Sequence, residues 1–156
     1  MKKLIILFLI IPLLATAQTF TGHTKVSVAK GISVLEKAYL DFGELIVNGE
    51  GTITIAPNGT PTITGSLTQK NVTSVGVLQV NGMPNSSIVL TLPTTATMTY
   101  NSFSLYVTEF KSDFVPTTKL DANGILNLSI GAKLSIPANF NYGGYIGTYS
   151  VTISYQ

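Results

Sequence analysis

The chain has 156 residues, no Cys, no Trp and one His, and charged residues make up only 10% of it. This length favours a single domain, while low charge with 45% hydrophobic content excludes a disordered chain and a coiled coil. The lack of Cys excludes disulfides, thiol catalysis and thiolate zinc sites.

The first seventeen residues contain the three parts of a secretory signal peptide in order. Met1 is followed by Lys2 and Lys3, residues 4–14 are an almost unbroken apolar run, and residues 15–17 read Ala-Thr-Ala. The apolar run is too short for a membrane span, which needs ~20 residues. We therefore expect a signal peptide at 1–17 and a secreted mature chain in the periplasm, at the cell surface or outside the cell, with no membrane span.

Removal of the signal changes the charge balance of the chain. Two of its nine basic residues leave with the signal, so seven Lys face seven acidic residues and the formal net charge becomes zero. The chain also has no Arg and no Lys cluster. Binding to nucleic acid requires a basic patch, so nucleic acid is excluded as a partner.

The stretch after the signal alternates apolar and polar residues over an unusual length. Since most strands have ~3–10 residues, one strand does not cover it. Two interpretations remain open for residues 18–37: an ordinary first strand broken from the next at Gly31 or Glu36, or a separate N-terminal strand at residues 20–30 that precedes the domain. A detachable strand can complete the sheet of another subunit. The candidate strand-donor residues are Phe20, Val26 and Val28, and the implied partner is a second copy of the chain.

The remainder, residues 38–156, reads as strands and turns of one domain. Asn-Gly pairs at 48–49, 58–59, 81–82 and 123–124 predict tight hairpin turns. Period-two runs lie between them, and no segment shows helical periodicity. We predict an all-β, immunoglobulin-like antiparallel β-sandwich of roughly eight to ten strands, with a closed barrel as the alternative. In the last strand, Tyr149, Val151 and Ile153 should face the core.

Candidate chemistry is sparse, and we predict no catalytic residue, no metal site and no cofactor. His23 is the one imidazole, and we interpret it as a solvated residue near the mature N-terminus. Phe140, Tyr142 and Tyr145 lie among Asn and Gly residues and are the candidate ligand-facing aromatic side chains, for example for a surface glycan. The alternative is a turn before the last strand, with Tyr145 packed as a corner residue.

Several short motifs resemble a known family. They read LDFG at 40–43, GTITI at 51–55, VNG at 80–82, LTLP at 90–93, LSIPAN at 134–139 and GGYIGTYSVTISY at 143–155. Together they resemble the domain-of-unknown-function family 4402 of secreted bacterial proteins. The resemblance implies a β-sandwich at an extracellular or envelope location, with no catalytic residues. A looser similarity links the penultimate Tyr155 and Gly143, fourteenth from the end, to the C-termini of chaperone–usher pilins.

Two function classes follow from these observations, with an enzyme as a distant third. The first is a secreted, non-catalytic structural or adhesive protein of the cell surface, such as a fimbrial or filament subunit that assembles by β-strand donation. The second is an extracellular binding module for a glycan or another surface component. A fold alone does not choose between them.

Overall fold

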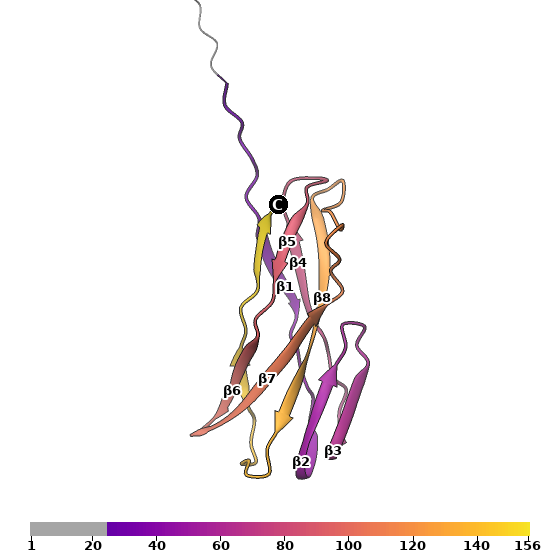
Figure 1. Cartoon of the computed structure of the whole chain (residues 1–156), viewed down its shortest axis with the longest axis vertical. Coiled ribbons are helices and arrows are strands. Elements are labelled where there is room, and N and C mark those ends of the chain that lie inside the picture. The colour runs from indigo at the N-terminus through magenta and orange to yellow at the C-terminus, as the bar shows by residue number, and fades with distance from the viewer. Residues whose placement is uncertain (1–24) are drawn as a thin grey trace, which may run out of the picture.

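The computed structural model describes residues 25–156, which form ten β-strands and no helix (Figure 1). Nothing in this described part is a helix long and apolar enough to cross a membrane. All strand pairs are antiparallel, so the prediction of an all-β antiparallel sandwich is confirmed. The strands are β1 (Ser33–Ala38), β2 (Leu45–Ile55), β3 (Pro61–Gln69), β4 (Gly76–Asn81), β5 (Ile88–Thr91), β6 (Thr95–Tyr100), β7 (Phe103–Ser112), β8 (Ile125–Ile136), β9 (Ile146–Thr148) and β10 (Thr152–Tyr155).

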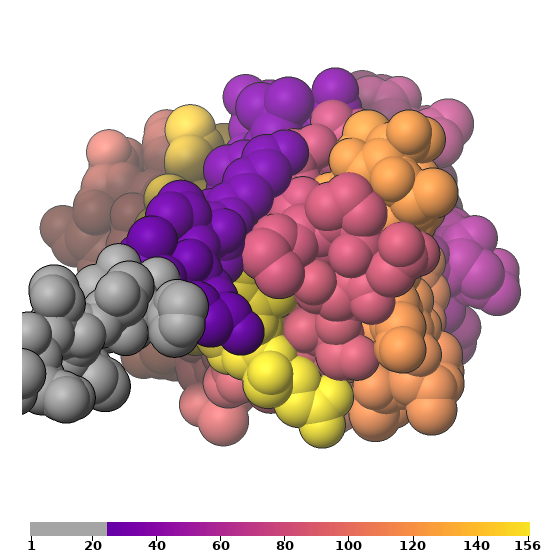
Figure 2. All heavy atoms as spheres, turned by 90° about the horizontal axis from the view of Figure 1, so that it is seen from above, coloured from indigo at the N-terminus to yellow at the C-terminus, as the bar shows by residue number. Residues whose placement is uncertain are grey.

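Residues 25–32 precede β1 and belong to no strand. They extend beyond the body at the end where the C-terminus lies, roughly in line with β1 (Figure 1). Seen from above, this indigo segment projects from the same end of the molecule as the yellow C-terminal residues (Figure 2). The N-terminal segment therefore leaves the body at the pole where the C-terminus lies.

The long strand β8 organises the larger sheet. β4 pairs with residues 125–130 of β8, and β2 pairs with residues 133–136, so these two strands follow one another along β8. β7 pairs with residues 130–135, and β6 and β9 continue the sheet beyond it. This arrangement curls the sheet into a half-barrel rather than closing it (Figure 1).

A second, two-stranded sheet of β5 and β10 extends the β6–β9 pair towards the pole with the termini. The two pairs do not form one continuous ladder. Five residues separate Thr91 from Thr97 on one side, but only three separate Thr148 from Thr152 on the other. Pro93 lies in the longer link, and proline has no N–H to donate to a ladder. Residues 149–151, opposite this link, pair with no strand.

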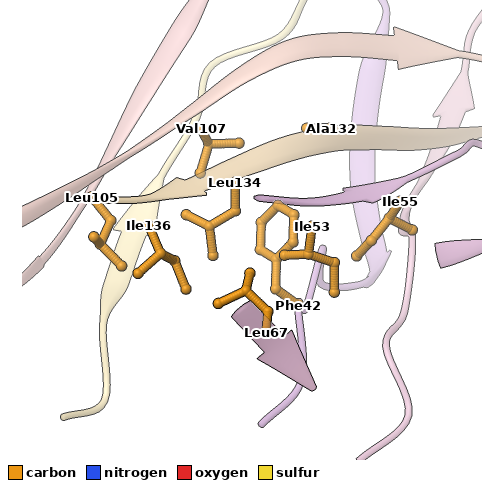
Figure 3. Packing of buried hydrophobic residues seen from close by; sticks show 9 residues of the cluster. All are labelled: Phe42, Ile53, Ile55, Leu67, Leu105, Val107, Ala132, Leu134 and Ile136. Atoms are coloured by element: carbon orange, nitrogen blue, oxygen red, sulfur yellow. The ribbon is translucent and has the colours of Figure 1, made fainter. Parts of the chain in front are cut away.

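Buried side chains form two clusters, one in each half of the body. The larger cluster lies between β2, β3, β7 and β8, where Phe42, Ile53 and Leu134 point toward one another (Figure 3). The smaller cluster comprises Val80, Ile88, Leu120 and Leu128 and lies below the pole with the termini. Alternate residues of β4 are buried, as expected for a strand with one face in the core.

Two of the four Asn-Gly pairs form the tight turns that the sequence predicts. The pair at 58–59 forms the turn between β2 and β3, and the pair at 123–124 lies in the turn that leads into β8. The pair at 48–49 instead lies inside β2, where the register against β3 shifts. The pair at 81–82 ends β4, and the chain then crosses to β5 in the other sheet. At both positions long-range strand pairing decides the conformation, not the local turn preference.

Candidate functional site

The candidate strand-donor residues that the structure describes are fully accessible. Val26 is 85% exposed and Val28 is 90% exposed. All residues from 25 to 31 are exposed as well. Phe20 and His23 lie outside the described residues. Alternate residues of an extended chain share a face, so Val26 and Val28 form an apolar stripe that the rest of the described chain does not cover.

The base of this segment is fixed to the C-terminal strand. The Tyr155 hydroxyl donates to the carbonyl oxygen of Lys30 at 2.8 Å and accepts from the N–H of Met83 at 2.7 Å. Ile32 is half-buried and packs against the smaller cluster. The exposed segment thus ends at Lys30, which is held beside Tyr155.

An open groove runs along the side of the body between β1 and the link that joins β9 to β10. We call it the lateral groove, and it has a volume of about 410 Å³. β1 pairs with β4 along one edge and leaves its other edge unpaired. Most side chains along the groove are apolar, and they include Val34, Leu78, Ala96, Met98, Phe110 and Val151, with Glu36 as the charged one.

Tyr149 also lines the lateral groove, and its ring packs on Phe110 with 5.3 Å between ring centroids. Its hydroxyl is buried and has no hydrogen-bond partner among the described residues. Burial raises the pKa of this hydroxyl, and the negative charge of Glu36 adds to the effect. The predicted last strand is shorter than expected, since β10 begins at Thr152 and residues 149–151 pair with no strand. The predicted alternation holds, because Tyr149, Val151 and Ile153 are half-buried and the residues between them are exposed.

The three candidate ligand-facing aromatic residues lie at the opposite pole, around the link between β8 and β9 (Figure 1). Tyr142 is 75% exposed, and its ring meets Phe140 edge-on with 4.9 Å between centroids. Tyr145 is packed instead, as its ring lies 5.8 Å from that of Tyr100 and its hydroxyl donates to the carbonyl of Asn141 at 2.9 Å. Tyr145 is therefore a corner residue, and Tyr142 is the aromatic side chain open to a ligand.

A second pocket of about 490 Å³ lies beside these rings, and we call it the aromatic pocket. Its polar side includes the Glu44 carboxylate, which accepts from Lys70 at 2.7 Å and from the Asn71 amide at 3.1 Å. The Lys70–Glu44 pair is about half exposed, so it contributes little to the stability of the fold. Over residues 25–156, no group of three or more His, Cys, Asp or Glu side chains is placed to hold a metal ion.

The sequence interpretation missed the lateral groove, the position of Tyr149 in it and the contact of Tyr155 with the base of the exposed segment. Their only sequence signal is the spacing of tyrosines in the C-terminal motif. The partners of these tyrosines, near residues 30, 76 and 83, are distant in the chain, so no local pattern connects them.

Comparison with known proteins gives one match. No curated protein and no solved structure matches the chain. The looser similarity to chaperone–usher pilins is thus not confirmed. A family model described as Domain of unknown function (DUF4402) matches residues 32–155, which begins just after the exposed segment and runs through β10. Because this match covers most of the chain, the protein belongs to the DUF4402 family.

Proposed function

We propose that this protein is a secreted, non-catalytic structural or adhesive protein of the cell surface, a fimbrial or filament subunit that assembles by strand donation. The observation that carries the proposal is the exposure of Val26 and Val28, at 85% and 90%, on a segment outside the sheets. Burying a valine side chain is worth about 1.5–3 kcal/mol. The isolated subunit gains none of this energy, whereas a second copy with an open sheet edge can supply it.

The secretion part of the proposal rests on residues 1–17, whose charged start, apolar run and small-residue end have the order of a cleaved signal. Intact-mass measurement of the exported protein tests it. We expect a chain that begins at Gln18. A mass that retains residues 1–17 contradicts secretion by this route.

Assembly is tested by light scattering across a range of concentrations, together with electron microscopy. The wild-type protein should form larger species as its concentration rises. The double variant Val26→Asp/Val28→Asp should stay monomeric and keep its melting temperature, because neither side chain packs in its own body. Val72→Asp is the matched control, since Val72 is 88% exposed but lies at the aromatic pocket. If the double variant and the control assemble equally well, the segment is not the donor.

The aromatic pocket favours a second candidate function, an extracellular binding module for a glycan. Its supporting observation is the 75% exposure of Tyr142 beside a pocket with carboxylate and amide groups. A glycan array followed by titration calorimetry tests this function. Tyr142→Ala should abolish binding, while Tyr39→Ala, which removes a tyrosine that is 76% exposed outside this pocket, should not. Equal losses in both variants count against a defined site.

A further inference from the structure

The lateral groove lies between two stretches of backbone that offer unused pairing positions. β1 has an unpaired edge on one wall, and residues 149–151 on the other wall pair with no strand. Unpaired edges of this kind readily accept another strand. The apolar lining between them can receive the side chains of an added strand. The groove thus offers both backbone pairing positions and side-chain pockets, which a strand-acceptor site requires.

We propose that the lateral groove is the acceptor site for residues 25–30 of a second copy of this chain. The segment enters as a β-strand, with Val26 and Val28 directed into the groove and Lys25 and Ser27 at its ends and outer side. This inference rests on the proposed function and adds to it the place where the donated segment binds.

The segment and the groove match in length and side-chain pattern. β1, which forms one wall, has six residues, as does the segment 25–30. The two valines alternate with Ser27 and Ala29, which gives one apolar face. Leu78, Ala96 and Met98 line the groove and provide the apolar surface that this face needs.

Charge also favours this occupant. The segment has Lys25 and Lys30 at its two ends and no acidic residue. Glu36 is the charged residue among those that line the groove. The lysines of the incoming segment are therefore attracted by the charge of the groove rather than repelled, and this attraction should weaken as salt is added.

The geometry places the acceptor in another copy rather than in the same chain. Tyr155 holds the carbonyl of Lys30 at 2.8 Å, and the residues before Lys30 continue away from the body (Figure 1). To reach its own groove, the segment would have to reverse direction directly beside this contact. A neighbour stacked along the long axis needs no reversal.

Stacking of this kind sets the direction of the donated strand. Copies related by a shift along the long axis keep the same polarity, so residues 25–30 enter antiparallel to the neighbour's β10 and to the link before it. Donor and acceptor are different surfaces of each copy. Such a head-to-tail contact gives an open filament unless rotation closes it into a ring.

The absence of native Cys allows a direct test by disulfide trapping in the otherwise unaltered chain. V26C and V28C are each combined with A96C or V151C, both in the lateral groove. A disulfide forms only where Cα atoms approach to about 4.4–6.8 Å. We expect a ladder of covalent oligomers on a non-reducing gel, with the cross-linked peptides identified by mass spectrometry.

The matched control pairs each donor cysteine with T62C, an exposed position on β3, whose outer edge is likewise unpaired. A ladder from the groove pairs and none from the T62C pairs supports the proposal. Melting temperatures identify any variant that fails to fold, and A96C and V151C serve as alternatives to each other.

The other outcomes separate this inference from the proposed function. A ladder from T62C alone, or oligomers in light scattering without any groove cross-link, overturns the groove as acceptor and leaves strand donation standing. A chain that stays monomeric at every concentration overturns both.

Discussion

The hydroxyl of Tyr155 lies so close to Gly82 that a Cβ added at Gly82 would be 2.5 Å from it. Tyr149 has the same relationship with Gly76, again at 2.5 Å. Gly76 begins β4 and Gly82 follows its last residue, so the two tyrosines lie across the two ends of this strand. They differ in one respect, because the Tyr155 hydroxyl has two hydrogen-bond partners and the Tyr149 hydroxyl has none among the described residues.

Replacing Tyr155 by Phe should destabilise the protein. The change leaves the N–H of Met83 and the carbonyl of Lys30 without the hydroxyl that joins them. The Met83 bond is part-buried whereas Lys30 is exposed, so we expect a loss of about 1 kcal/mol, mainly from the Met83 N–H. Urea unfolding followed by circular dichroism measures the loss, and an unchanged midpoint would show that water replaces the hydroxyl at no cost.

The matched change at Tyr149 should have the opposite sign. Tyr149→Phe keeps the ring on Phe110 and removes a buried hydroxyl that has no described partner. We expect the free energy of unfolding to stay the same or to rise by about 1 kcal/mol. A clear loss of stability in the same urea experiment would mean that this hydroxyl is bound by a group outside the described residues or by water.

Alkaline pH should weaken the fold through Tyr149. Its pKa is raised in the folded chain, first by burial and then by Glu36, so the unfolded chain releases this proton first, near pH 10. Stability is therefore unaffected by this group below pH 10 and falls as pH rises through the folded pKa, because ionisation favours the unfolded chain. Unfolding midpoints between pH 9 and about 11.5 should fall more steeply in wild type than in Tyr149→Phe. Parallel slopes in the two proteins would contradict this role.

Gly76→Ala should be destabilising because the new methyl group meets the Tyr149 hydroxyl. Overpacking of this kind typically costs 1–3 kcal/mol. Removing the hydroxyl should recover part of the loss, so Gly76→Ala and Tyr149→Phe should show a coupling energy in a double-mutant cycle. Additive effects would mean that the backbone of β4, rather than the hydroxyl, rejects the methyl group.

Much of the strand content follows from the sequence, because alternating residues report directly which face of a strand is buried. Ile153 in β10 is one such case, whereas the same alternation at Tyr149 and Val151 continues into a link that pairs with no strand. The pair at 48–49 shows the limit of this reasoning. Asn-Gly favours a tight turn locally, yet β2 continues through it because β3 pairs with both sides of the shift.

The candidate site was less accessible to sequence reasoning than the fold. The donor residues Val26 and Val28 could be predicted from a local pattern, because apolar and polar residues alternate there over more residues than one strand usually has. The lateral groove does not, because it is formed where β1 and the link between β9 and β10 lie on opposite walls. Elements from the two ends of the chain create it, and only the strand order brings them together.

Hydrogen–deuterium exchange of residues 25–30, compared between the dilute monomer and the purified assembly, addresses strand donation without any substitution. We predict rapid exchange of these amides in the monomer and strong protection in the assembly, with new protection also at residues 149–151. Amides of residues 25–30 that exchange equally fast in both states, or that are already protected in the monomer, would contradict donation of this segment to a second copy.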